Sequence, residues 1–180
     1  MIERTKRRLR QAQFFYQHLV NQQAKGDQET FRFYFSAFIL SARTVTWTLK
    51  NEEKKKWKAW EPQWRDKRTE EEQKLLDDTN ELRTADTHEG GAKLTMELEE
   101  IAVEALLDAI PPRPGLNAAY IRRLRRQSGA AGVRLMQPVH YFEDKNGKQK
   151  ITTLCRRYLK FLEKVVKDFC ADMGSNAGND

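Results

Sequence analysis

Two side chains that could do chemistry together, Arg83 and His88, stand near the end of one predicted helix. An imidazole titrates near neutral pH, so a histidine can take up or release a proton during a reaction. A guanidinium binds oxyanions through paired hydrogen bonds and stabilises negative charge that develops in a transition state. The pair therefore predicts proton transfer beside a bound anion, and we expect neither a metal nor another cofactor to take part.

The same two residues also have a structural interpretation. Arg83 can pair with Asp86 one helical turn later, and His88 can bind the last carbonyl groups of the helix, where the helix dipole favours a cation. On an ideal helix, side chains five positions apart diverge by roughly 140°. Acidic residues also outnumber basic ones between positions 70 and 104, which disfavours a bound phosphate. Catalysis thus requires a frayed helix end or a second subunit that brings the two groups together.

Two strongly basic segments could contact a nucleic acid. The first combines three lysines with Trp57 and Trp60, whose rings could stack on bases while the lysines bind phosphates. The helical spacing of these tryptophans with Trp64 favours inward-facing rings on an exposed helix instead. The second segment is an arginine cluster, and such a cluster is more often a solvated helix face. The basic residues of the two segments are Lys54, Lys55, Lys56, Arg122, Arg123, Arg125 and Arg126.

Arg43 stands within a long apolar segment, and the sequence predicts that it is buried. A buried guanidinium requires a partner. Glu81 and Asp78, on the helix that carries Arg83, are the acidic candidates. The two cysteines have no clustered histidines or further cysteines near them in sequence, so they predict neither a disulfide framework nor a zinc site.

Apolar residues recur at helical spacing in the segments that must position these side chains. Gly26 and Asp27 are expected to end the first helix and to cap the second, which makes the two helices an antiparallel pair. Thr69 and Glu72 form a capping-box pattern at the start of the third long helix. Pro62 is expected to break any helix near it. The four long helices are predicted at residues 3–25, 28–50, 70–88 and 153–171.

The pattern changes between residues 92 and 153, where we expect a β excursion. Alternation of Leu94, Met96 and Leu98 with polar residues predicts one strand. A second strand is expected around Pro138, whose missing N–H suits an edge or a bulge, and a hairpin turn follows it. The expected fold is mainly α: an antiparallel bundle of four or five helices with a small β insertion before the C-terminal helix. Residues 1–173 would form one domain and residues 174–180 a flexible tail.

The composition limits the class of protein. The chain has 180 residues, a net charge of +7 and 33% charged residues, which permits attraction to phosphate-rich partners. It contains no apolar run long enough to span a bilayer, and its basic N-terminus lacks the pattern of a signal peptide. We therefore expect a cytoplasmic protein without a membrane contact.

Three segments resemble the HEPN-like family (higher eukaryotes and prokaryotes nucleotide-binding), in an uncharacterised bacterial branch. Residues 81–91 contain an arginine and a histidine separated by four residues, similar to the motif of that family. Residues 38–49 are similar to the apolar second helix of the branch, and residues 155–162 to its closing helix. The resemblance covers the helices and leaves out the β excursion. Thr84 stands where catalytic members usually carry a more strongly polar residue.

The resemblance implies an all-α homodimer in which the motifs of two subunits face each other and, in catalytic members, cut RNA without a metal. Arg83 would hold the scissile phosphate, and His88 would move a proton at the ribose 2′-hydroxyl or at the leaving oxygen. Two other interpretations stay open. The protein could be a non-catalytic binding or assembly module, or a regulatory, antitoxin-type protein that binds a protein partner through its acidic third helix.

Overall fold

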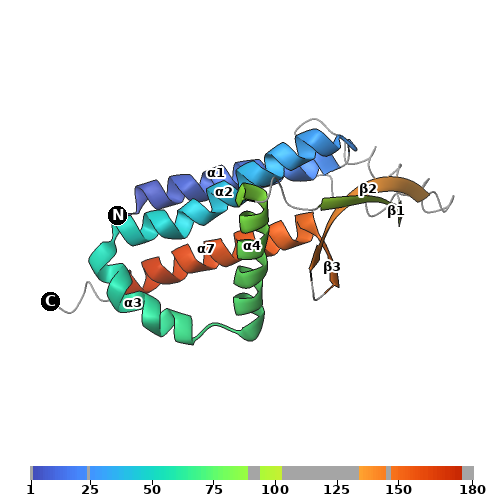
Figure 1. The fold of residues 1–180 in the computed structure, drawn as a ribbon. Helices are drawn as coiled ribbons and strands as arrows, with labels where there is room; N and C mark the ends of the chain where they lie inside the picture. The colour runs from blue at the N-terminus through green and yellow to red at the C-terminus, as the bar shows by residue number, and fades with distance from the viewer. Residues whose placement is uncertain (1, 24, 89–93, 103–133, 145–146, 176–180) are drawn as a thin grey trace, which may run out of the picture.

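The computed structural model describes residues 2–23, 25–88, 94–102, 134–144 and 147–175. Five helices make up most of this part, and a small antiparallel sheet lies at one end of them (Figure 1). The predicted fold class is confirmed, because the protein is mainly helical with strands before its C-terminal helix. None of the described helices has the length and apolar character needed to cross a membrane. The elements are α1 (Glu3–Gln23), α2 (Gln28–Glu52), α3 (Lys54–Asp66), α4 (Glu70–His88), β1 (Leu94–Ala102), β2 (Arg134–Asp144), β3 (Gly147–Lys150) and α7 (Ile151–Ser175).

Helices α1 and α2 form the predicted antiparallel pair (Figure 1). Gly26 has a φ of +73°, a left-handed conformation that lets the chain reverse directly after α1. The Asp27 carboxylate accepts a hydrogen bond from the backbone nitrogen of Thr30 at 3.0 Å and so caps α2, as expected. One face of α2 is buried in the core through Phe31, Phe35, Phe38, Ile39, Ala42, Val45 and Leu49.

Helix α4 begins with the predicted capping box. The backbone nitrogen of Glu72 donates to Thr69 Oγ1 at 3.2 Å, and the backbone nitrogen of Thr69 donates to Glu72 Oε2 at 3.1 Å. In Figure 1, α4 runs across α2 and α7, and both contacts bury apolar side chains such as Leu75 and Leu82. The crossing holds the second half of α4, which carries Arg83, against two other helices.

The prediction that Pro62 breaks the chain's helical path was wrong, since Pro62 lies inside α3. Pro62 lies on the exposed side of α3, so the local disturbance of the helix does not fall in the core. Two tryptophans on the opposite side hold α3 in place: Trp60 Nε1 donates to Asp172 of α7 at 2.7 Å, and Trp64 Nε1 donates to Asp168 at 3.2 Å. Tertiary packing therefore outweighs the local cost of the proline.

The sheet has the strand order β1-β2-β3, and both pairs of neighbours are antiparallel. Pro138 lies opposite Leu98 of β1, while β3 pairs only with residues 141–144 of β2. On the side away from β1, the paired part of β2 does not include Pro138. Its missing N–H therefore breaks no hydrogen bond with β3, in agreement with the predicted edge position. His140 of β2 is fully buried and stacks on Phe31 of α2, with ring centroids 3.6 Å apart, so the sheet is docked on the N-terminal end of α2.

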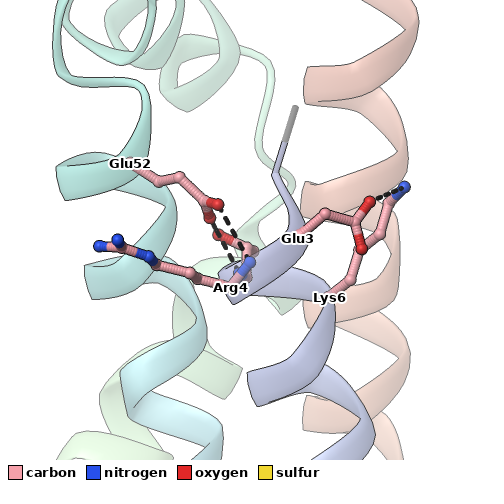
Figure 2. A network of polar contacts seen from close by, with 5 residues as sticks. Glu3, Arg4, Lys6 and Glu52 are labelled. Atoms are coloured by element: carbon pink, nitrogen blue, oxygen red, sulfur yellow. Dashed lines mark hydrogen bonds and ion pairs between the residues drawn. The ribbon is translucent and has the colours of Figure 1, made fainter.

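The carboxylate of Glu52, at the end of α2, caps the start of α1 (Figure 2). It accepts hydrogen bonds from the backbone nitrogens of Arg4 at 3.0 Å and Thr5 at 2.9 Å, and from the hydroxyl of Thr5 at 2.8 Å. Partial desolvation raises the pKa of Glu52, but the hydrogen bonds from Arg4 and Thr5 outweigh it, and the pKa lies below its ordinary value. The contact joins the C-terminal end of α2 to the N-terminal end of α1.

Replacing Glu52 with glutamine is expected to lower the free energy of unfolding by about 1 kcal/mol at neutral pH, the usual effect of losing a helix cap. Because the folded-state pKa of Glu52 is depressed, its contribution is present above the unfolded-state pKa and is lost as the pH falls through the folded-state value. Urea denaturation at pH 7 and pH 3 measures both effects. A difference between wild type and Glu52→Gln that is as large at pH 3 as at pH 7 would contradict the charged cap.

Candidate functional site

The surroundings of Arg83 are built from three helices. Arg83 lies half-buried on α4, Arg43 lies exposed on α2, and Tyr158 lies on α7 with only 8% of its surface exposed. The positive charges of Arg43 and Arg83 both act on the hydroxyl of Tyr158, which places the three polar groups in one neighbourhood. The sequence separation of these helices is large, so only the fold brings them together.

Polar contacts with α4 side chains position both guanidinium groups. Arg43 Nη1 donates to Asn80 Oδ1 at 3.3 Å, which connects α2 to α4. Arg83 Nη2 contacts Thr84 Oγ1 at 3.4 Å, and Thr84 Oγ1 donates to the carbonyl oxygen of Asn80 at 2.9 Å. Asn80 and Thr84 thus link the two arginines along one edge of α4.

The prediction that Arg43 is buried and paired with Glu81 or Asp78 was wrong. Arg43 is exposed because it lies outside the buried stripe of α2, and its observed partner is the neutral Asn80 of α4. Asp78 is buried and accepts a hydrogen bond from Gln149 of β3 at 3.1 Å, while Glu81 is exposed. Arg43 is therefore available at the surface next to Arg83.

Asp86 makes a contact that the sequence did not indicate. The predicted structural partner of Asp86 was Arg83, whereas its Oδ1 accepts a hydrogen bond from Ser36 Oγ of α2 at 2.8 Å. This bond and the bond between Arg43 and Asn80 fasten the second half of α4 along one side of α2. The side of α2 that carries Ser36 and Arg43 is therefore the side that faces α4.

Tyr158 is the site residue that sequence reasoning missed, because its spacing assigned it only to the buried side of the last helix. Burial raises the pKa of Tyr158 to about 12, although the charges of Arg43 and Arg83 and a hydrogen bond with Thr79 act in the opposite direction. The hydroxyl is therefore neutral at physiological pH. The one available signal was that a buried tyrosine hydroxyl needs a polar partner.

Several predicted site residues lie outside the described part of the protein. His88 is the last residue of α4, and its side chain is among those outside it. The arginine cluster is wholly outside the described residues as well. Its members are Arg122, Arg123, Arg125 and Arg126.

The lysine and tryptophan segment forms the start of α3. Lys54, Lys55 and Lys56 are exposed, and Lys56 Nζ pairs with Glu53 at 3.6 Å. Trp60 and Trp64 are buried against α7, which confirms the expectation of inward-facing rings and removes them as a platform for bases. The lysines are therefore left as surface charges that lie at the opposite end of α2 from the sheet (Figure 1).

The described residues contain no group of three acidic, histidine or cysteine side chains that could hold a metal ion. Comparison of the chain with protein-family models, with curated proteins and with solved structures finds no match. Two arginines beside the amide of Asn80 form a donor-rich surface that suits an oxyanion such as a phosphate.

Proposed function

We propose that this protein is a HEPN-like, cytoplasmic RNA-binding protein that acts as a homodimer and cuts RNA without a metal, with Arg83 and His88 as its reacting pair. The observation that carries the proposal is that Arg43 and Arg83 lie along one edge of α4, where Arg43 binds Asn80 and Arg83 contacts Thr84, which in turn binds Asn80. A second guanidinium next to the motif arginine offsets the acidic character of α4, which otherwise disfavours a phosphate.

The proposed reaction uses a nucleophile that the RNA supplies. The ribose 2′-oxygen attacks the neighbouring phosphorus, the bond from phosphorus to the 5′-oxygen breaks, and a 2′,3′-cyclic phosphate and a 5′-hydroxyl are formed. His88 takes the proton from the 2′-hydroxyl, and water protonates the leaving oxygen. Arg83 and Arg43 bind the phosphate oxygens and stabilise the charge that develops there.

The test is cleavage of single-stranded RNA by purified protein in the presence of EDTA. Wild type is expected to cut RNA, to leave DNA of the same sequence intact and to release cyclic-phosphate ends. His88→Ala is expected to lower the rate by at least about 100-fold, the usual contribution of a general base. His18→Ala is the matched control, because His18 lies on α1 and stacks on Tyr34 outside the site.

Arg83→Ala and Arg43→Gln separate phosphate binding from proton transfer. Both are expected to weaken RNA binding and to flatten its salt dependence, since each removes a phosphate contact. His88→Ala is expected to leave binding intact. Wild type that is folded yet cuts no RNA from a broad set would overturn the ribonuclease, and unchanged RNA binding by both Arg83→Ala and Arg43→Gln would overturn the phosphate site.

A non-catalytic HEPN-like binding or assembly module, or a regulatory, antitoxin-type partner protein, is the second candidate. It is favoured by large apolar side chains that α2 leaves exposed, since such residues in a row are typical of contact surfaces. Salt-dependent RNA binding without cleavage would support this module over the enzyme.

A further inference from the structure

Helix α2 is apolar on two opposite faces, and only one of them is buried. Phe33, Leu40 and Trp47 remain 64%, 48% and 66% exposed. They stand at intervals of seven residues. Side chains seven positions apart on a helix point in directions that differ by only about 20°. We call these three residues the α2 ridge. A ridge with this period is typical of a helix that packs along another helix.

We propose that the α2 ridge binds the α2 ridge of a second copy of this chain, antiparallel, with a two-fold axis at Leu40. The ridge is symmetric about Leu40, since Phe33 stands seven positions before it and Trp47 seven positions after it. In this arrangement Leu40 meets the partner's Leu40, and Phe33 of each copy meets the partner's Trp47. A two-fold contact uses the same patch twice and requires such a self-complementary pattern.

The charges beside the ridge favour the same arrangement. Glu29 lies eleven positions before Leu40 and Lys50 ten positions after it, and both are exposed. Antiparallel packing therefore brings Glu29 of each copy to the partner's Lys50, whereas a parallel pair would bring like charges together. Arg43 likewise meets the side of the partner's α2 that carries Ser36, whose hydroxyl is bonded to Asp86. Glu29 and Lys50 thus form oppositely charged pairs at both ends of the contact.

The contact also completes the candidate site. Ser36 and Arg43 lie on the side of α2 that faces α4. Under the proposed two-fold axis, the α4-facing sides of the two α2 helices lie next to each other. The two α4 helices therefore border one groove that runs across the contact. Arg43 and Arg83 of each copy then line this groove together. The inference rests on the homodimer of the proposed function and is independent of whether the site cuts RNA.

Light scattering coupled to gel filtration tests the contact. Wild type is expected to be a dimer, and Leu40→Glu is expected to raise its dissociation constant at least about 100-fold, because it places two carboxylates together on the axis. Phe14→Glu is the matched control, since Phe14 is an exposed aromatic on α1. Far-ultraviolet circular dichroism verifies that each variant is folded. A monomeric wild type, or a dimeric Leu40→Glu, would overturn the inference.

The register has its own test. Glu29→Lys and Lys50→Glu are each expected to weaken the dimer, and the double variant is expected to restore it. In a Cys170→Ser background, which removes the exposed native thiol, Leu40→Cys is expected to form a disulfide-linked dimer under mild oxidation, whereas Arg32→Cys is not. Failure of the double variant to rescue the dimer would refute the antiparallel register. Loss of the dimer with RNA cleavage retained would refute the inference that the contact completes the site, while leaving the proposed cleavage standing.

Discussion

Truncating Phe38 to alanine is expected to lower the free energy of unfolding by about 3–5 kcal/mol, the range for removing a fully buried aromatic ring. Phe38 is 0% exposed and lies on the buried face of α2, with its ring 6.1 Å from that of Tyr16 of α1. The contact joins the first two helices, and interiors are packed too tightly to close such a cavity fully. Chemical denaturation at fixed protein concentration measures the loss.

The matched control is Phe14→Ala on α1. Phe14 is 56% exposed, so the same chemical change removes little buried surface and should cost well under half as much. Equal losses for the two variants would show that α1 and α2 do not pack through Phe38. A fixed protein concentration matters, because dimerisation stabilises the folded state by mass action.

Acidification is expected to destabilise the protein through His140. Burial, followed by the charge of Arg32, lowers the pKa of His140 to about 4, whereas the unfolded-state value is 6.5. A histidine with a depressed folded-state pKa contributes stability above the unfolded-state pKa, and the contribution is lost as the pH falls from 6.5 toward 4. Each unit of pKa difference corresponds to about 1.4 kcal/mol, so the loss at pH 5 is roughly 2 kcal/mol.

His140→Phe isolates this effect from the other groups that titrate in acid. Phenylalanine keeps a planar ring against Phe31, on which His140 stacks at 3.6 Å, and it cannot take up a proton. The difference in free energy of unfolding between variant and wild type, measured by urea denaturation from pH 7 to pH 4, should move in favour of the variant as the pH falls. A difference that stays constant over this range would contradict a buried neutral imidazole.

Local signals in the sequence predicted much of the fold. The turn at Gly26 and the caps at Asp27 and Thr69 depend on neighbouring residues alone, and all three are confirmed. The same rules failed at Pro62, where the burial of Trp60 and Trp64 against α7 stabilises a helix that the proline disfavours. Local helix preferences are overridden where contacts with residues far away in the sequence contribute more to the stability of the fold.

The candidate site could be predicted only in part. The helix that carries Arg83 was predicted correctly, but the burial of Arg43 was misjudged because the buried residues of the long apolar segment cover only one side of α2. The proximity of Arg43, Arg83 and Tyr158 depends on how α4 crosses α2 and α7. The periodicity of apolar residues within a single helix does not predict how helices cross. The roles of Arg83 and His88 in catalysis remain predictions.

The four tryptophans lie in two different environments, so the intrinsic fluorescence of the protein can report on two regions separately. Trp47 is largely in contact with water, while Trp60 and Trp64 are shielded by α7 and Trp57 is half-buried beside them. Indole emission moves to longer wavelength in water, so the red part of the intrinsic fluorescence reports on the outside of α2 and the blue part on α3. A soluble quencher that reaches only the red part would follow events at one surface without disturbing the signal from the other.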